Sequence, residues 1–198
     1  MVNIRMAKAT DCREMLDIYG PVIKSTATSF EYTVPSLGEF QARFMRIHSA
    51  YPWLVCQWDE QVAGYAYSGP HRTREAYQWS VELSVYVSPP FYRRGIASAL
   101  YSSLISLLSL QGYYTGLAGI SLPNDKSVKF HEAIGFTPVG IYSNVGYKFG
   151  EWHSVGWWEL ALNSYSREPK ELLSIEEMSQ STTCQDILSD SENMIKSS

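Results

Sequence analysis

The sequence contains few cysteines, no long apolar run and no excess of positive charge. Its three cysteines, Cys12, Cys56 and Cys184, are widely spaced and form no metal-binding or redox pattern, so we expect no metal site. An odd number of cysteines without a signal peptide is typical of a reducing compartment, so we expect a cytoplasmic protein. Because no stretch of 18 apolar residues is present, we expect no membrane-spanning helix.

Charge is unevenly distributed along the 198 residues. Seven of the 20 acidic residues and three of the 16 basic ones lie in residues 166–198, so residues 1–165 are neutral. This balance argues against a nucleic-acid partner. We predict one globular domain, residues 1–165, followed by an acidic, Ser- and Glu-rich tail, residues 166–198. The composition of the tail favours disorder, with a short amphipathic helix over Leu172–Met178 as the alternative.

Hydrophobic periodicity predicts interspersed strands and helices in residues 2–162. Strands are predicted at residues 2–8, 53–58, 61–68, 78–87, 115–121, 137–143 and 155–162. Capping residues and apolar faces predict helices from residue 10 to about 24 and at residues 36–49, 97–110 and 126–134. A Gly- and Trp-rich loop is expected between residues 143 and 155. This order predicts an α/β fold with a mixed sheet that is parallel in its middle.

A strand, a glycine turn and a helix organise the chain. The strand Val81–Val87 stops at Ser88-Pro89-Pro90, and the basic turn Tyr92–Ser98 then opens the helix. Backbone N–H groups at a helix start lack intrahelical partners and, with the helix dipole, form an anion site suited to phosphate. The alternative is an ordinary turn with two solvated arginines, because short glycine motifs also occur by chance.

Several sequence blocks around this turn resemble a known family. They are YPWLV (residues 51–55), VAGYAY (62–67), VYVSP (85–89), LPND (122–125) and WHSVG (152–156). In this order they resemble the GNAT superfamily of acyl-CoA-dependent N-acyltransferases, and within it the phosphinothricin N-acetyltransferases. The resemblance covers residues 2–162. It implies a GNAT-like α/β fold, with a mixed, splayed central sheet flanked by helices.

The resemblance also implies an activity. The expected reaction is direct transfer of the acetyl group of acetyl-CoA to the amine of a small glutamate-like amino acid or analogue. Phosphinothricin, methionine sulfone and methionine sulfoximine are the expected acceptors, which connects the family with herbicide and antibiotic resistance. Homodimers are common in the family, so we expect one here. Two other classes stay open: a CoA-binding regulatory module without chemistry, and a protein N-terminal acetyltransferase.

The resemblance assigns the residues that bind acetyl-CoA. The turn would hold the pyrophosphate through its backbone N–H groups, the preceding strand would pair with the pantetheine arm, and a second block would follow the LPND motif. These residues are Arg93, Arg94, Gly95, Ile96, Ala97 and Ser98 in the turn, Val85, Tyr86 and Val87 in the strand, and Asn124, Ser127 and Phe130 in the second block. Tyr92 stands where the family usually has Gln or Arg, so that side-chain contact is not expected here.

Glu82 is the candidate general base. The amine of an amino acid is largely protonated at neutral pH and must lose a proton before it attacks a thioester. Glu82 interrupts an apolar strand, where an unpaired carboxylate is costly, and it matches the base position of the family. It would act either after activation by burial among aromatic residues or through one ordered water. The alternative is a structural Glu bonded to a neighbouring strand.

Two histidines are further catalytic candidates by resemblance. His131 is in the register where many superfamily members carry a tyrosine that protonates the departing thiolate. The alternative is a packing residue, and a thiolate also leaves tolerably without help because the pKa of a thiol is about 8.5. His153 aligns with an active-site histidine that would orient the acceptor or assist the proton transfer. Its alternative is a core histidine bonded to a backbone carbonyl.

The loop His71–Tyr77 is the candidate for acceptor recognition. Arg72, Arg74 and Tyr77 align with residues that contact the acidic groups of the acceptor in the phosphinothricin enzymes. Arginine presents a fixed fork of donors that suits a carboxylate or phosphinate. A solvated loop is the alternative. Phe30 would pack against the acceptor, unless it belongs to the core.

Overall fold

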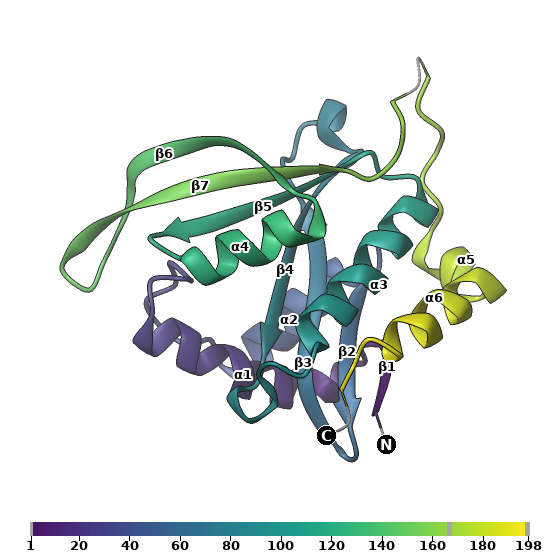
Figure 1. Cartoon of the computed structure of the whole chain (residues 1–198), viewed down its shortest axis with the longest axis horizontal. Helices are drawn as coiled ribbons and strands as arrows, with labels where there is room; N and C mark the ends of the chain where they lie inside the picture. The colour runs from purple at the N-terminus through teal and green to yellow at the C-terminus, as the bar shows by residue number, and fades with distance from the viewer. Residues whose placement is uncertain (1, 166–167, 197–198) are drawn as a thin grey trace.

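In the computed structural model, which describes residues 2–165 and 168–196, seven strands form one sheet in the order β1-β2-β3-β4-β5-β7-β6 (Figure 1). The strands are β1 (Val2–Met6), β2 (Trp53–Trp58), β3 (Gln61–Pro70), β4 (Ser80–Val87), β5 (Thr115–Leu122), β6 (Thr137–Lys148) and β7 (Glu151–Ala161). The helices are α1 (Cys12–Ser25), α2 (Leu37–Ile47), α3 (Ile96–Gln111), α4 (Asp125–Ile134), α5 (Ile175–Ser179) and α6 (Thr182–Glu192), with short 3-10 turns η1 (Ala9–Asp11), η2 (Glu75–Tyr77) and η3 (Pro89–Phe91).

The sheet is antiparallel except where β4 meets β5. Strands β1 to β4 form one antiparallel half, and β5, β7 and β6 form the other. The parallel pairing between the halves covers three residue pairs: Ser80 with Thr115, Val81 with Gly116, and Glu82 with Leu117. The two strands then diverge (Figure 1). The mixed, splayed sheet expected from the sequence is therefore confirmed.

Helices cover both faces of this sheet. Helix α3 packs on β2, β3 and β4, and its Leu100 and Leu104 are fully buried in the larger core. Helices α1 and α2 pack over a second, aromatic core, in which Phe40 and Trp53 meet edge to face with ring centroids 6.2 Å apart. Within the described ranges, no helix combines the length and the apolar character needed to cross a bilayer.

Alternation along β4 divides its side chains between the two faces of the sheet. Val81 and Leu83 are buried in the core beneath α3. Tyr86 points to the other face, where it packs edge-on against Tyr19 of α1 with ring centroids 5.0 Å apart. Glu82 shares the face of Tyr86 by the same two-residue period. The period of the strand thus keeps this carboxylate out of the larger apolar core.

Strands β6 and β7 form one long hairpin, where shorter strands and a loop were expected. The segment between residues 143 and 155 pairs with itself and turns at Phe149-Gly150. Both turn residues have positive φ, 54° and 82°, the geometry of the primed turns that match the twist of a two-residue hairpin. Across the strands, the rings of Tyr147 and Trp152 meet with centroids 5.3 Å apart. The Gly- and Trp-rich composition therefore marks a hairpin, and the expected loop is corrected.

Between residues 168 and 196 the structure differs from the disorder expected for the tail and agrees with the alternative, a short helix near Leu172–Met178, because α5 spans Ile175–Ser179. Residues 166–167 and 197–198 of the expected tail lie outside the described residues. Helices α5 and α6 pack along α3, and α6 also contacts β1 (Figure 1). Ser174 caps α5 in a capping box with Glu177, and Ser181 caps α6 by accepting a hydrogen bond from the N–H of Cys184. Met178 and Cys184 are buried in the larger core. The average composition of the tail is polar and acidic, so it does not reveal the few apolar residues that pack on the core. These apolar contacts and the capping residues suffice to fold the segment.

The cysteines are free and buried. Burial raises the pKa of the Cys12 thiol to about 11 and that of the Cys56 thiol to about 12. Both groups are neutral thiols at physiological pH and are not nucleophiles. The prediction that Cys56 is a small buried hydrophobic residue is confirmed.

Replacing Met178 by Ala should lower the free energy of unfolding by about 2–5 kcal/mol, because the exchange removes a fully buried side chain from the core. Urea unfolding followed by circular dichroism measures the change. Gln180→Ala, at an exposed position after α5, is the matched control and should stay within about 0.5 kcal/mol of the wild type. A tail without fixed structure would give the same unfolding free energy for both variants.

Candidate active site

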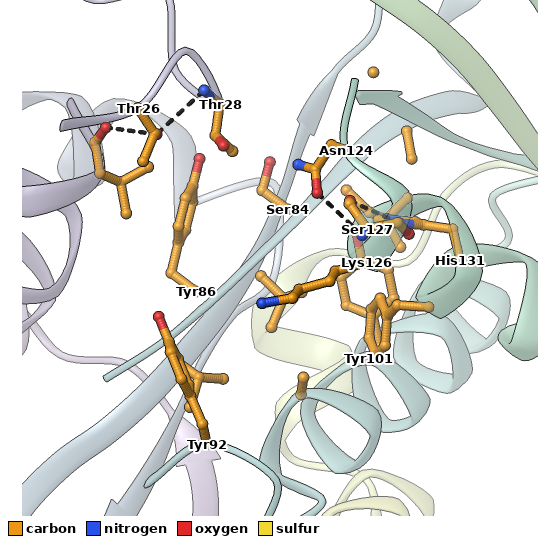
Figure 2. A pocket seen from close by; sticks show the side chains of 18 residues that line it. Thr26, Thr28, Ser84, Tyr86, Tyr92, Tyr101, Asn124, Lys126, Ser127 and His131 are labelled. Atoms are coloured by element: carbon orange, nitrogen blue, oxygen red, sulfur yellow. Dashed lines mark hydrogen bonds between the residues drawn. The ribbon is translucent and has the colours of Figure 1, made fainter. Parts of the chain in front are cut away.

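The divergence of β4 from β5 opens a cavity of about 410 Å³ in the middle of the sheet (Figure 2). Beyond Glu82, β4 has a strand partner on one side, so its other edge faces the cavity. Such an edge fits an extended arm that pairs with the backbone like an added strand. The cavity is lined by these residues that the sequence singled out: Val85, Tyr86, Val87, Ala97, Asn124, Ser127, Phe130 and His131.

The expected phosphate loop lies at the N-terminus of α3, beside this cavity. Gly95 is the N-cap with a φ of 85°, and Arg93 also has a positive φ, 64°. The N–H of Ala99 donates the first helical hydrogen bond to Gly95 O at 2.9 Å. The N–H groups of Ile96, Ala97 and Ser98 therefore point out of the helix start. Together with the helix dipole they fit a diphosphate.

The two arginines of the loop have different surroundings. The Arg94 guanidinium lies over the ring of Trp58, 4.7 Å from its centroid, which directs this side chain toward β2. The side chain of Arg93 is exposed. Tyr92 is 59% exposed and lines the cavity, where Figure 2 shows its hydroxyl on the same side as Tyr86. The loop thus offers one cation that is not stacked on a ring.

Helix α4 forms the wall opposite β4. The Oδ1 atom of Asn124 caps this helix by accepting a hydrogen bond from Ser127 N–H at 3.2 Å. Lys126 extends its ammonium across the cavity toward Tyr86 and Tyr92 (Figure 2). Lys126 was not among the residues expected from the sequence, although its place in the first turn after the LPND motif was a usable signal.

Glu82 is in the last residue pair that joins β4 to β5 and directly precedes Leu83, which lines the cavity. Its Oε1 accepts a hydrogen bond from His71 Nδ1–H at 2.8 Å, and its side chain is 41% exposed. A carboxylate so accessible is not enclosed among aromatic residues, which favours the second of the two expected routes, action through an ordered water. The ring of His71 packs edge-on against Tyr77 and Trp157, and this residue was expected only as the first residue of the acceptor loop.

The expected acceptor loop runs from His71 into η2. Arg72, Arg74 and Tyr77 are exposed there. His71 also lines a second cavity, of about 130 Å³, together with Leu117, Val139, Gly140, Tyr142 and Trp157. Because Leu117 is the strand partner of Glu82, this smaller cavity lies next to the candidate base.

His131 is buried and bonded at both ring nitrogens. Its Nδ1–H donates to Ser127 O at 2.8 Å, and its Nε2 accepts from the hydroxyl of Tyr101 at 3.1 Å. Burial lowers the pKa of His131, so its ring is neutral at pH 7. Tyr101, which the sequence analysis missed because it lies within an apolar helix, lines the same cavity.

His153 and Phe30 lie together, but away from Glu82. Their ring centroids are 6.1 Å apart, and the His153 Nε2–H donates to Lys148 O at 3.0 Å. Ser154, the next residue, pairs with the end of β5 five residues beyond the partner of Glu82. At about 3.3 Å per residue, the Leu122 pair with Ser154 lies roughly 16 Å along β5 from the Leu117 pair with Glu82. The bond of His153 to a carbonyl is the one that a structural histidine makes, which favours that alternative over a part in orienting the acceptor or in the proton transfer.

Lys148 is a buried lysine that the sequence analysis also missed. Its ammonium donates three hydrogen bonds, to Ile23 O at 2.7 Å, Thr26 O at 2.9 Å and Ser29 O at 2.6 Å. Carbonyls at a helix C-terminus favour a cation, whereas burial lowers the pKa of this ammonium. The bonds fasten the β6–β7 hairpin to the end of α1, where residues 26–28 line a further cavity of about 280 Å³.

Comparison with known proteins decides the family. Residues 4–157 match the acetyltransferase (GNAT) domain. The chain belongs to the GNAT acetyltransferase family. This assignment confirms the expected acetyl-CoA-dependent N-acetyltransferase, for which acetyl-CoA is the cosubstrate.

Individual relatives of this GNAT acetyltransferase cover most of its length. A phosphinothricin N-acetyltransferase of Streptomyces viridochromogenes is 41% identical over 80% of this chain and 86% of the relative. An L-methionine sulfoximine/L-methionine sulfone acetyltransferase of Salmonella typhimurium is 32% identical over 83% of this chain and 97% of the relative. A crystal structure of a phosphinothricin acetyltransferase from Sinorhizobium meliloti in complex with AcCoA has a TM-score of 0.82 and 32% identity, covering 86% and 94% of the two chains.

The neutral state of His131 should make stability depend on pH. As the pH falls below about 6.5, an unfolded histidine takes up a proton, whereas the buried ring, with its lowered pKa, does not. The stability that His131 contributes is therefore fully present at pH 7.5 and is lost as the pH falls, by at most about 1.4 kcal/mol per pH unit. The difference in unfolding free energy between wild type and His131→Phe should shrink from pH 7.5 to 5. A constant difference would contradict this assignment.

Proposed function

We propose that this acetyltransferase acetylates the amine of a small amino acid with an acidic or strongly polar side chain, of the phosphinothricin and methionine sulfoximine type. Relatives named for these acceptors align over about four fifths of the chain. The observation that carries the proposal is the position of Glu82. It precedes Leu83, which lines the large cavity, and it contacts His71 and pairs with Leu117, which both line the small cavity. A base at that position meets both the acetyl donor and the amine.

The large cavity is the proposed site of acetyl-CoA, which supplies the activated acetyl group when it is bound. The N–H groups of Ile96, Ala97 and Ser98 would hold the pyrophosphate, with Arg93 adding positive charge. The open edge of β4 would pair with the pantetheine arm. Lys126 supplies a second cation on the opposite wall (Figure 2).

Glu82 is the proposed general base and acts through one water. The exposure of its side chain leaves space for that water, and the bond from His71 fixes the orientation of the carboxylate. The ammonium of the acceptor loses one proton through the water to Glu82. The freed lone pair of the amine then forms the new bond to the acetyl carbon, while the bond from that carbon to sulfur breaks. The nitrogen releases its extra proton to solvent, which leaves a neutral amide and the CoA thiolate.

His131 is proposed to shape the wall of the cavity instead of protonating the thiolate. Its Nδ1 proton is directed at Ser127 O, and its Nε2 already accepts the proton of Tyr101. A neutral ring bonded in this way has no free N–H for the sulfur. The thiolate leaves without a dedicated acid because the pKa of a thiol is low, about 8.5.

The exposed loop after β3 is the proposed recognition element for the acceptor. Arg72 and Arg74 would contact its acidic groups, and Tyr77 would pack beside them, next to His71. Phe30 and His153 contact each other, and His153 lines the cavity at the end of α1, whereas His71 of the arginine loop lines the smaller cavity beside Leu117. We therefore assign acceptor binding to the arginine loop alone.

A homodimer is part of the same proposal. Strand β6 is an edge strand, and its Val139, Ile141 and Val145 are each more than half exposed. A long apolar edge open to water invites pairing with another strand. A second copy of this chain would cover it.

Glu82→Gln should lower kcat with phosphinothricin by about 10²-fold or more, the scale of a lost general base, while the Kd for CoA stays unchanged. Thiol release measures turnover, and calorimetry measures CoA binding. Glu60→Gln, which removes an exposed carboxylate from the turn between β2 and β3, is the matched control and should retain full turnover. If Glu82→Gln turns over at the wild-type rate, Glu82 is not the base.

Arg72→Gln and Arg74→Gln should each raise the KM for phosphinothricin about tenfold or more, because each removes a charge-assisted hydrogen bond to the acceptor. Methionine sulfone, whose side chain carries no charge, should be affected less. Arg46→Gln, at an exposed position of α2, serves as the control. Equal losses for both acceptors would place the two arginines outside the recognition of the acidic group.

A further inference from the structure

The last helix of the chain is fixed to the sheet close to the phosphate loop. Helix α6 packs on α3 and β1. At its end, Oε1 of Glu192 accepts a hydrogen bond from the N–H of Ile4, an edge-strand residue, at 2.8 Å. Ile195, which follows the helix, is 8% exposed and joins the larger core. Helix α6 and Ile195 lie outside residues 4–157, the part that matches the GNAT domain. Helix α3 and Ile4, which they contact, lie within it.

Beyond α6 the chain runs directly behind the phosphate loop. The N–H of Lys196 donates to Arg94 O at 2.9 Å. The carbonyl oxygen of Met194 lies so close to Gly95 that a Cβ at this position would be 2.5 Å from it. Two constraints therefore require glycine at position 95: its positive φ of 85°, and the lack of space for a Cβ beside the carbonyl of Met194.

The opposite side of the loop is also held. Arg94 sits over Trp58 of β2, so its side chain is stacked on the sheet while its carbonyl is bonded to the end of the tail. The loop thus has fixed contacts behind it, and its N–H groups at the start of α3 stay free to bind an anion. A loop ordered before binding loses less conformational entropy when it takes up its ligand.

We propose that residues Asn193–Lys196 form an intramolecular strap that holds the phosphate loop in its binding conformation and so raises the affinity for the phosphate-bearing part of CoA. The proposal rests on the assignment of the Arg93–Ser98 loop to the pyrophosphate. The strap residues position the loop and do not touch the coenzyme.

Lys196→Pro tests the strap because proline lacks the N–H that Arg94 O accepts. Lys196→Ala keeps this N–H, so the difference between the two variants reports the backbone bond. The Kd for CoA of Lys196→Pro should exceed that of Lys196→Ala by about three- to tenfold, the range for one lost hydrogen bond. A chain that stops after Asn193 should show at least the same loss. Gln185→Ala, on the exposed face of α6, is the control for the tail.

A second readout separates positioning from general damage. S-acetylpantetheine carries the acetyl thioester but lacks the phosphates. The preference in kcat/KM for acetyl-CoA over S-acetylpantetheine should fall in Lys196→Pro by the same factor as CoA binding, with turnover of S-acetylpantetheine retained. Equal losses with both donors, or no loss with either, would overturn the strap.

Ser98→Asp distinguishes failure of the strap from failure of the loop assignment. A carboxylate at the start of α3 is compatible with the helix but repels a phosphate. If Ser98→Asp binds CoA normally, the loop assignment fails and the strap with it. If Ser98→Asp abolishes CoA binding while Lys196→Pro matches Lys196→Ala, the strap alone is wrong.

Discussion

The short parallel ladder between β4 and β5 is the constraint on which the rest of the site depends. It ends at Glu82 and Leu117, after which β4 continues beside β3 and β5 continues beside β7. Each half of the sheet keeps its own antiparallel partners and its own twist, so the two central strands separate. An unpaired strand edge is normally a liability, but here it faces a cavity inside the protein. The same divergence exposes a backbone edge and leaves a carboxylate in the last pair of the ladder.

Contacts at the periphery hold the two halves of this divided sheet in place. Lys148, on the hairpin of the second half, binds carbonyls of Ile23 and Thr26 at the end of α1 and of Ser29 in the following loop, and α1 packs on the first half. The hydroxyl of Tyr32 also donates to Tyr147 O of the hairpin. Phe30 fills the space beside Gly146 so closely that a side chain there would collide with its ring. Side-chain contacts, and not strand pairing, therefore connect the two halves of the sheet where β4 and β5 have separated.

Local sequence signals predicted most helices and strands, whereas contacts between residues far apart in the chain determine how the side chains of the site are placed. The Ser36–Glu39 capping box and the glycine turn before α3 could be read from the sequence because each depends on neighbouring residues. The bond from Lys148 to Ile23 joins residues 125 positions apart, which periodicity cannot reveal. Resemblance named His153, but the register of β5 and β7 decides its distance from Glu82. The hairpin and the tail were misjudged because composition averages over the few residues that pair or pack.

Burial of the three thiols has a consequence for an enzyme whose product is itself a thiol. Every turnover liberates free CoA, and mixed disulfides form when a thiolate reaches an accessible sulfur. Cys12, Cys56 and Cys184 are covered by protein, and burial raises the pKa of each, so none presents a thiolate at the surface. The acetyltransferase therefore resists covalent capture by its own oxidised product.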